Sequence, residues 1–221
     1  RLGLAAQRFE ATRWTALPAA EQARFFSPEL NARQFYKPLV NGEKGCYASH
    51  LRSCQWLLDS PHPALVVLED DVALLPDFAR VIEAIAALPP SWDLIKLIGR
   101  IDHQETDKLR ARRPLVEGFE LIDFQRVPSM TAGHVISRSG ARKLLDARLP
   151  FGRPVDVDLR HWWEHPGGGL KVQGVLPAVI ALDETSQQSS IGSTNPPGLA
   201  ARWRKFRHKA AYTLGNAWHQ R

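Results

Sequence analysis

The hydrophobic positions of this chain recur with two different periods, and these periods alternate along the sequence. In residues 44–59 the apolar side chains are spaced as on one face of a helix, namely Tyr47, Leu51, Cys54 and Leu58. Residues 64–68 follow as an uninterrupted aliphatic run, which predicts a buried strand. A second helical stripe in residues 76–88 ends at Pro89 and Pro90.

The alternation continues through the second half of the chain. Residues 92–98, 133–137 and 175–182 have the composition of strands. A helix is predicted over residues 139–146, with Ser139 as its N-cap. The charged stretch 103–113 predicts an exposed loop. Because strands alternate with helices, the pattern predicts an α/β layered fold.

Three consecutive carboxylates, Glu69, Asp70 and Asp71, come directly after the first predicted strand. Burying three unpaired negative charges would cost too much, so they lie at an exposed strand end or are neutralised. A divalent cation relieves their repulsion, and oxygen ligands suit Mg²⁺ or Mn²⁺. Ligands of open α/β sheets bind where strands end. The alternative is a solvated acidic turn before a helix, with Asp71 as N-cap.

Charge is distributed unevenly over the 221 residues, whose net charge is +6. From Leu199 onward there is no acidic residue, and the six basic residues are Arg202, Arg204, Lys205, Arg207, Lys209 and Arg221. The other 23 basic residues balance the 23 acidic ones, so the body is neutral. No apolar run approaches the roughly 20 residues that span a bilayer. No signal-peptide pattern is visible, although the chain opens on Arg1.

The two cysteines, Cys46 and Cys54, lie eight residues apart in the first predicted helix. Eight helical residues rise about 12 Å, which is too far for a disulfide. Reduced thiols are typical of a reducing compartment. Cys46, His50 and Cys54 share a helical track, but the same rise spreads them too widely for one tetrahedral zinc site. We therefore expect core thiols.

The basic tail has the pattern of an amphipathic helix. Its apolar positions form one face, composed of Leu199, Trp203, Phe206, Ala210 and Leu214. The cations occupy the remaining surface, as in helices that lie on anionic membranes. The alternative is that the same apolar face docks on the rest of the protein.

Five segments between residues 42 and 190 carry motifs. They are G-E-K-G-C-Y-A-S-H-L at 42–51, L-E-D-D-V at 68–72, D-L-I-K-L at 93–97, G-H-V-I-S-R-S-G-A-R-K-L-L at 133–145 and P-V-D at 154–156. In this order they resemble glycosyltransferase family 25, which includes lipooligosaccharide galactosyltransferases and collagen hydroxylysine galactosyltransferases. The resemblance implies a GT-A-like fold with a mainly parallel sheet between helices.

The resemblance also implies a reaction and its metal. The expected reaction is an inverting transfer of a hexose, usually galactose from UDP-galactose, assisted by Mn²⁺ or Mg²⁺. The metal would bridge the diphosphate and the carboxylates Glu69, Asp70 and Asp71, and stabilise the departing UDP. Asp183 follows a predicted strand and is a further candidate metal ligand or sugar contact.

An inverting transfer needs a general base for the acceptor hydroxyl. Asp156 matches the family position and is the first candidate, Asp158 is its rival and Glu164 the third. The alternative role of Asp156 is to cap a helix over residues 157–163. Ser49 and His50 match family positions within the first helix, so they either support the core or reach the nucleotide.

Family members begin with a strand and helix that carry nucleotide-binding residues, and nothing before Arg1 supplies them. Either the sequence starts after them or part of the donor site is lost. We expect residues 1–195 to form the transferase domain without that first strand, and residues 196–221 to form the tail.

We expect a cytoplasmic, peripheral enzyme on the inner face of the cytoplasmic membrane that extends a lipopolysaccharide or lipooligosaccharide core. One alternative is a catalytically degenerate module that binds a sugar nucleotide or glycan. Another is nucleic-acid binding through the tail. No nucleic-acid partner is expected, because the body is neutral and has no recognition motif.

Overall fold

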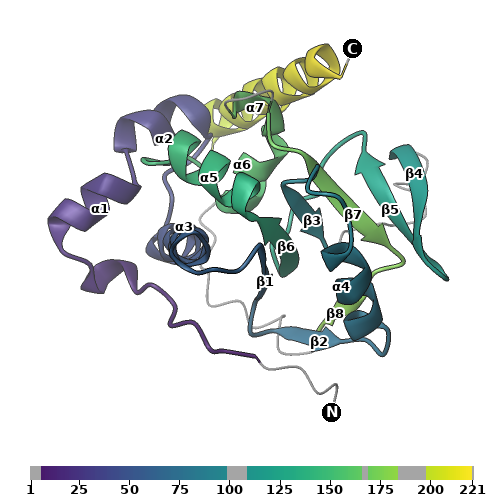
Figure 1. Cartoon of the computed structure of the whole chain (residues 1–221). Coiled ribbons are helices and arrows are strands. Elements are labelled where there is room, and N and C mark those ends of the chain that lie inside the picture. The colour runs from purple at the N-terminus through teal and green to yellow at the C-terminus, as the bar shows by residue number, and fades with distance from the viewer. Residues whose placement is uncertain (1–5, 99–108, 166–168, 184–197, 221) are drawn as a thin grey trace.

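The computed structural model describes residues 6–98, 109–165, 169–183 and 198–220, and its centre is a six-stranded sheet (Figure 1). In spatial order the strands are β1 (Ala64–Leu68), β6 (Gly133–Ser137), β3 (Leu94–Lys96), β7 (Val172–Leu176), β5 (Phe119–Phe124) and β4 (Leu109–Val116). A separate two-stranded ladder joins β2 (Val72–Leu74) to β8 (Ile180–Leu182).

The sheet is mixed, which corrects the mainly parallel sheet that the family resemblance implied. Among the described strands of this sheet only β3 and β7 run parallel, and the other neighbouring pairs are antiparallel. The reason is that β6 enters between β1 and β3 in the opposite direction, while β4 and β5 form a hairpin. As a result, the start of β6 lies beside the ends of β1 and β3: Leu68 pairs with Gly133, and Lys96 pairs with His134.

Helices cover both faces of the sheet, which confirms the predicted α/β class. The long helix α3 (Asn41–Asp59) packs with α5 (Arg138–Ala147) on one face, and α4 (Phe78–Ala86) covers the other. Neighbouring strand residues alternate between these two cores, since Leu94 belongs to the α3 side and Ile95 to the α4 side. The sheet edge that carries the predicted carboxylates is thus held between two apolar layers.

Short helices complete the α3 side. They are η1 (Trp14–Ala16), α1 (Ala19–Phe25), α2 (Pro28–Gln34), α6 (Val155–Arg160) and η3 (Trp162–Glu164). The C-terminal helix α7 (Leu199–His219) confirms the predicted helical tail and runs along one edge of the molecule (Figure 1). None of the described helices is both long enough and apolar enough to cross a bilayer.

Helix α7 docks through a face that the sequence pattern did not predict. Tyr212 is buried, stacks on Trp163 at 5.8 Å between ring centroids, and lies under the Arg160 guanidinium. Asn216 is also buried, donates to the Gln125 carbonyl at 2.9 Å and accepts from the Trp162 indole. The alternative that the apolar stripe docks on the domain is therefore wrong, because Leu199, Trp203, Phe206 and Leu214 are exposed.

Several local predictions also need correction. The N-cap of α5 is Ser137, whose hydroxyl accepts from the Gly140 N–H, and not Ser139. The part of the predicted loop 103–113 that is described, from Leu109 onward, is strand β4. The predicted strand over 175–182 is divided between β7 and β8, since Pro177 cannot donate to a ladder.

Candidate functional site

The first carboxylate of the triplet, Glu69, is anchored where β1 ends. Its N–H donates to the Ala132 carbonyl at 2.8 Å, and its side chain accepts from the Thr131 hydroxyl at 2.6 Å. His50 Nε2 on α3 lies 3.5 Å from the same carboxylate oxygen. Burial alone would raise the pKa of Glu69, but the hydrogen bonds of His50 and Thr131 lower it. Glu69 is therefore a fixed anion at the sheet edge.

Asp71 and Asp183 are brought together by the β2–β8 ladder. Val72 pairs with Leu182, and the Asp183 N–H donates to the Asp71 carbonyl at 2.8 Å. Burial raises the pKa of Asp71, and the charges of Glu69, Asp70 and Asp183 raise it further. The alternative of Asp71 as a helix N-cap is wrong, because the following residues form β2.

The donor set of this acidic cluster, Glu69, Asp70, Asp71 and Asp183, fits a divalent cation. All four groups offer oxygen ligands, which Mn²⁺ and Mg²⁺ accept. Asp71 Oδ1 is buried and has no hydrogen-bond partner within the described parts of the chain. A buried carboxylate oxygen without a partner, surrounded by like charges, is stabilised by a bound cation.

Lys96 and His134 belong to the same sheet edge, although the sequence analysis did not select them. Lys96 ends β3 and is 2% exposed, and its ammonium donates to the Pro128 carbonyl at 2.6 Å. Burial lowers the pKa of Lys96 to about 7, opposed by the charges of Asp156 and Glu69. The available signal was a lysine inside an otherwise aliphatic strand, where a buried charge is rarely tolerated without function.

Two histidines pack beside Glu69. The rings of His50 and His134 stack with centroids 5.5 Å apart. Burial alone would lower the pKa of His50, but its hydrogen bonds with Cys46 and Glu69 raise it to about 9. Burial and the neighbouring charges of His50 and Lys96 lower the pKa of His134 to about 3. His50 is therefore the cation that faces Glu69, and His134 is the neutral ring stacked on it.

Asp156 lies in the first turn of α6 and is half-buried. It interacts electrostatically with Lys96, as Glu69 does, so Lys96 connects the acidic cluster to Asp156. Pro154 holds the N-cap position of α6 and no side chain caps the helix. The alternative role of Asp156 as a helix cap is therefore wrong.

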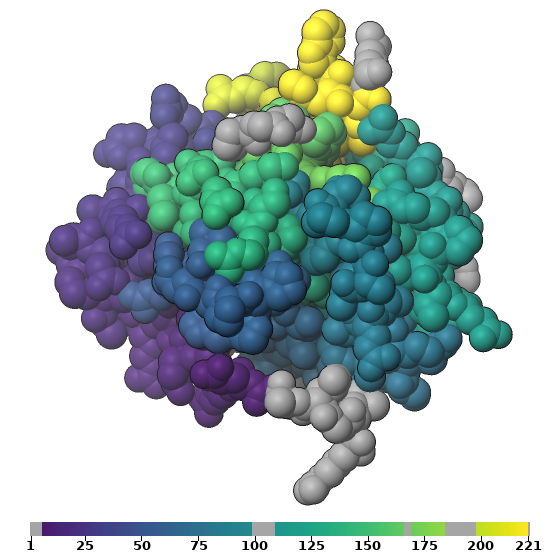
Figure 2. Space-filling model, viewed as in Figure 1, coloured from purple at the N-terminus to yellow at the C-terminus, as the bar shows by residue number. Residues whose placement is uncertain are grey.

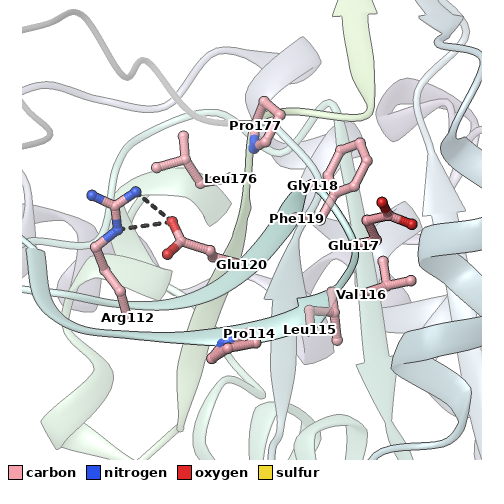
Figure 3. Close-up of a pocket in the computed structure, with 10 residues that line it drawn as sticks. All are labelled: Arg112, Pro114, Leu115, Val116, Glu117, Gly118, Phe119, Glu120, Leu176 and Pro177. Atoms are coloured by element: carbon pink, nitrogen blue, oxygen red, sulfur yellow. Dashed lines mark hydrogen bonds and ion pairs between the residues drawn. The ribbon is translucent and has the colours of Figure 1, made fainter.

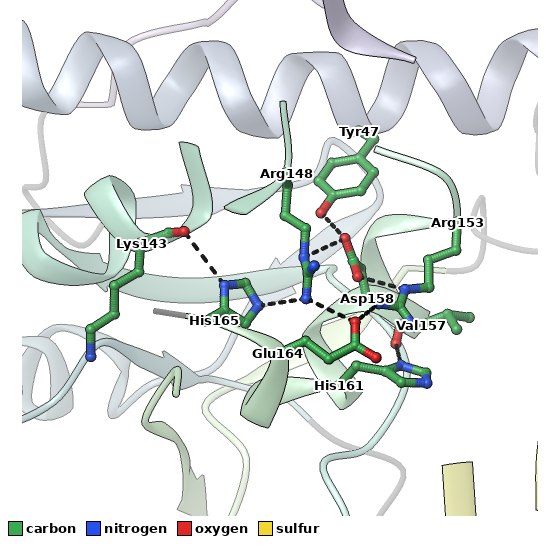
Figure 4. A network of polar contacts seen from close by, with 9 residues as sticks. All are labelled: Tyr47, Lys143, Arg148, Arg153, Val157, Asp158, His161, Glu164 and His165. Carbon is green, nitrogen blue, oxygen red and sulfur yellow. Dashed lines mark hydrogen bonds and ion pairs between the residues drawn. The ribbon is translucent and has the colours of Figure 1, made fainter. Parts of the chain in front are cut away.

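The rival bases belong to a buried ion-pair network (Figure 4). Asp158 is 1% exposed, lies 2.9 Å from Arg148 Nε and 2.7 Å from Arg153 Nε, and accepts from the Tyr47 hydroxyl. Glu164 pairs with the same two arginines. Both carboxylates are already committed to partners, so their geometry suits the joining of α3, α6 and η3 better than proton transfer from an acceptor.

The glycine-rich motif at the start of α3 has a structural explanation. Glu43 accepts from the Val40 N–H at 2.9 Å and so closes the first turn of the helix. A Cβ on Gly45 would lie 2.5 Å from the Thr12 carbonyl oxygen, so only glycine admits this segment. Ser49 accepts from the Thr12 N–H at 2.8 Å and donates to the Gly45 carbonyl. Ser49 therefore supports the core and does not sit free for a nucleotide.

Two surface hollows lie away from the acidic cluster. The larger, about 620 Å³, is open and is lined by the turn between β4 and β5 together with Leu176 and Pro177 (Figure 3). Its charged pair, Arg112 and Glu120, is exposed and mutually satisfied. No described residue of the acidic cluster lines either hollow. The candidate site at the sheet edge is therefore identified by its clustered charged side chains, and not by either of these hollows.

An α/β sheet with clustered carboxylates where a strand ends is an arrangement used by enzymes that handle phosphorylated ligands through a metal. The family model described as "Glycosyltransferase family 25 (LPS biosynthesis protein)" matches residues 1–159. This chain belongs to glycosyltransferase family 25.

Curated relatives resemble part of the chain. "Glycosyltransferase 25 family member" from Aedes aegypti is 33% identical over 125 residues, which are 55% of this chain and 19% of that protein. "Procollagen galactosyltransferase 2" from Mus musculus is 34% identical over 126 residues, with the same two shares. "Probable inactive glycosyltransferase 25 family member 3" from Rattus norvegicus is 32% identical over 126 residues, 55% of this chain and 21% of that protein. The matches span about a fifth of each relative.

Proposed function

We propose that this protein is an inverting glycosyltransferase that transfers galactose from UDP-galactose to a lipopolysaccharide or lipooligosaccharide core. The observation that carries the proposal is the acidic cluster around the unpartnered Asp71 oxygen, at the sheet edge that also holds Lys96. The name "Procollagen galactosyltransferase 2" of a relative supports galactose, and the family description supports a lipopolysaccharide acceptor.

The acidic cluster, Glu69, Asp70, Asp71 and Asp183, would hold Mn²⁺ or Mg²⁺. When bound, such a cation supplies positive charge that stabilises the diphosphate of the departing UDP. Glu69 is positioned for this role by Thr131 and His50, which fix the orientation of its carboxylate. Asp71 and Asp183 are positioned by the hydrogen bond between their backbones.

Asp156 is the proposed general base. It would accept the proton of the acceptor hydroxyl as that oxygen attacks the anomeric carbon of the donor sugar. Lys96 links Asp156 to the acidic cluster, because the charges of both Asp156 and Glu69 act on its buried amine. The commitment of Asp158 and Glu164 to Arg148 and Arg153 leaves Asp156 as the preferred candidate among the three.

The proposed location is the inner face of the cytoplasmic membrane, where a lipid-linked acceptor is presented. Helix α7 supports it, because the docked face leaves large apolar side chains in solvent: Leu199 is 81%, Trp203 65% and Phe206 61% exposed. Five cations, Arg202, Arg204, Lys205, Arg207 and Lys209, lie on the same span of about three turns of helix. In Figure 2 this helix forms an outer rim of the molecule, in yellow. Such a surface suits anionic lipid.

A second candidate function is a module that binds UDP-sugar without turnover. It is favoured by the similarity to a rat relative whose name calls it probably inactive. Both candidates predict stabilisation by UDP-galactose with Mn²⁺, but only the enzyme releases UDP when acceptor is added.

The test is UDP release from UDP-galactose with Mn²⁺ and a lipooligosaccharide core acceptor. Asp71→Asn should abolish the metal-dependent release and leave the fold intact, because without metal the removed charge is repelled by its neighbours. Asp59→Asn, which neutralises an exposed carboxylate at the far end of α3, is the matched control. Full activity of Asp71→Asn at saturating Mn²⁺ would overturn the metal assignment.

A further inference from the structure

Three side chains of different chemistry converge beside the acidic cluster. Cys46 and His50 are one turn apart on α3, and Glu69 follows β1. One ligand atom of each, a sulfur, a ring nitrogen and a carboxylate oxygen, lies within 4.8 Å of the other two. Of these contacts the His50 Nε2 to Glu69 Oε1 distance is 3.5 Å. The three atoms can therefore reach a common centre with only small side-chain movements.

The donor set is selective. Sulfur, imidazole nitrogen and carboxylate oxygen together suit Zn²⁺, which favours four ligands and is softer than Mn²⁺ or Mg²⁺. Helical spacing alone speaks against zinc, because Cys46 and Cys54 are too far apart along α3. In the structure Cys54 is not part of the group, and the third ligand is Glu69. Because Glu69 lies outside α3, helical spacing alone cannot identify it.

The site is prepared and accessible. The Glu69 carboxylate is held by Thr131, as zinc-bound carboxylates are held by outer hydrogen bonds. The His50 ring is fixed by its stack on His134. Cys46 is a free thiol and only partly buried, and the Glu69 side chain is 33% exposed, so solvent or a ligand can occupy the fourth position.

We propose that Cys46, His50 and Glu69 form a binding site for Zn²⁺ that is distinct from the donor-metal site but shares Glu69 with it. Cys46 binds as thiolate and His50 as neutral imidazole, so binding releases their protons to solvent. No electron is transferred. Zinc binding itself does not depend on the proposed transferase function.

Sharing Glu69 has a consequence that does rest on the proposed function. When Zn²⁺ holds Glu69, this carboxylate is withdrawn from the acidic cluster, so zinc inhibits Mn²⁺-dependent transfer. The inhibition is relieved by a chelator that prefers Zn²⁺ to Mn²⁺. The rate of sugar transfer therefore falls as the concentration of Zn²⁺ rises.

The binding test uses Co²⁺ as a spectroscopic substitute for Zn²⁺, and competition of Zn²⁺ against a chromophoric chelator. The expected results are one ion per chain and a thiolate-to-cobalt charge-transfer band. Cys46→Ser should remove the band and weaken Zn²⁺ binding by more than about tenfold. Cys54→Ser is the matched control, because Cys54 is on the same helix but buried and outside the trio. It should bind like the unsubstituted chain.

Three results would overturn the zinc site: no thiolate band with Co²⁺, unchanged Zn²⁺ affinity in Cys46→Ser, or equal loss in Cys54→Ser. A separate arm measures UDP release with Mn²⁺ and increasing Zn²⁺. Cys46→Ser should keep the activity and lose most of the zinc inhibition. If the protein binds Zn²⁺ through Cys46 but releases no UDP under any condition, the proposed transferase function fails while the zinc site stands.

Discussion

The backbone N–H of Asp183 donates to the carbonyl oxygen of Asp71 at 2.8 Å, so the last described residue after β8 lies beside the residue that precedes β2. More than one hundred residues separate them in the sequence, and the ladder between Val72 and Leu182 brings them together. Asp183 is thereby added to a triplet that is local in sequence. Within the cluster, the Glu69 carboxylate is held by Thr131 and His50, whereas the charge of Asp71 is repelled by the neighbouring carboxylates.

This arrangement predicts opposite effects of Asp183→Asn with and without metal. Without metal the substitution should raise the free energy of unfolding slightly, by up to about 0.5 kcal/mol, because repulsion with Asp71 is relieved but screened by solvent. With Mn²⁺ it should weaken metal binding by about tenfold or more. Urea unfolding in chelator and Mn²⁺ titration by electron paramagnetic resonance measure the two effects. If Mn²⁺ affinity is the same as in Asp59→Asn, Asp183 is not a ligand.

Asp156→Asn should lower kcat by roughly 10²–10⁴-fold, the usual contribution of a positioned base. The affinity for UDP-galactose should change little, because the amide keeps the shape of the side chain and leaves the acidic cluster intact. Since Asp156 does not cap α6, the melting temperature should stay close to that of the unsubstituted protein. An unchanged kcat would remove Asp156 from the mechanism.

Asp158→Asn is expected to act on folding instead. The substitution leaves the guanidinium groups of Arg148 and Arg153 buried without their main counter-charge. Breaking a buried ion pair from one side costs about 3–5 kcal/mol. Chemical unfolding should show this loss, and in the fraction that remains folded, kcat should be nearly normal. A stable Asp158→Asn protein with a kcat reduced a hundredfold would make Asp158 the base in place of Asp156.

The sequence allowed the carboxylate triplet, the α/β class and the amphipathic tail to be predicted because each is a local pattern. Strand 64–68 and the acidic residues after it follow from hydrophobic runs and charge alone, and the structure places them as expected. The hairpin β4–β5 was missed, since the arginines of β4 resemble an exposed loop until the pairing with β5 is known. The antiparallel insertion of β6 likewise depends on which strands pair, and periodicity does not record that.

The site residues that the sequence missed all depend on tertiary contacts. Lys96 was overlooked because its burial and its proximity to the charges of Glu69 and Asp156 arise only in the folded chain. Asp156, the first candidate base, and Asp158, its rival, are two residues apart, yet Asp158 is paired with the arginines whereas the charge of Asp156 acts on Lys96. Helix geometry separates such neighbours by about 200°, so their roles differ although their sequence context does not.

The lowered pKa of Lys96 predicts a distinct pH dependence of stability. Its pKa is about 7 in the folded protein and near 10.5 when unfolded, so between these values the unfolded chain binds more protons. Stability therefore rises as pH increases through this window, by up to about 1.4 kcal/mol per pH unit. The penalty is fully present below pH 7.

The comparison that isolates this effect is unfolding of the unsubstituted protein and of Lys96→Met between pH 6.5 and 9. These limits lie about half a unit below and two units above the folded pKa, so they cover about half of the expected change. The difference in free energy of unfolding should move in favour of the lysine as pH rises. A pH-independent difference would mean that Lys96 stays charged in the folded state.

The two faces of α7 predict two separable defects. Trp203 and Phe206 stack on each other in solvent at 5.7 Å between centroids, whereas Tyr212 is buried against Trp163. The double substitution Trp203→Ser and Phe206→Ser should leave the melting temperature unchanged and release the protein from vesicles rich in phosphatidylglycerol. Tyr212→Ala should instead lower the melting temperature, because it removes the ring on which the helix docks. Truncation of a buried aromatic side chain costs about 3–5 kcal/mol.

The salt dependence of vesicle binding separates the contribution of the cations from that of the apolar side chains on the exposed face of α7. Each cation near an anionic surface contributes about 1 kcal/mol, so binding of the unsubstituted chain should weaken steeply between low and physiological salt. Vesicles of phosphatidylcholine alone should bind poorly, because the apolar side chains insert only after the cations bring the helix to the surface. Turnover of a short soluble acceptor should survive the double substitution. If that variant binds anionic vesicles as the unsubstituted chain does, or if its fold is lost, the exposed face of α7 has a role other than membrane contact.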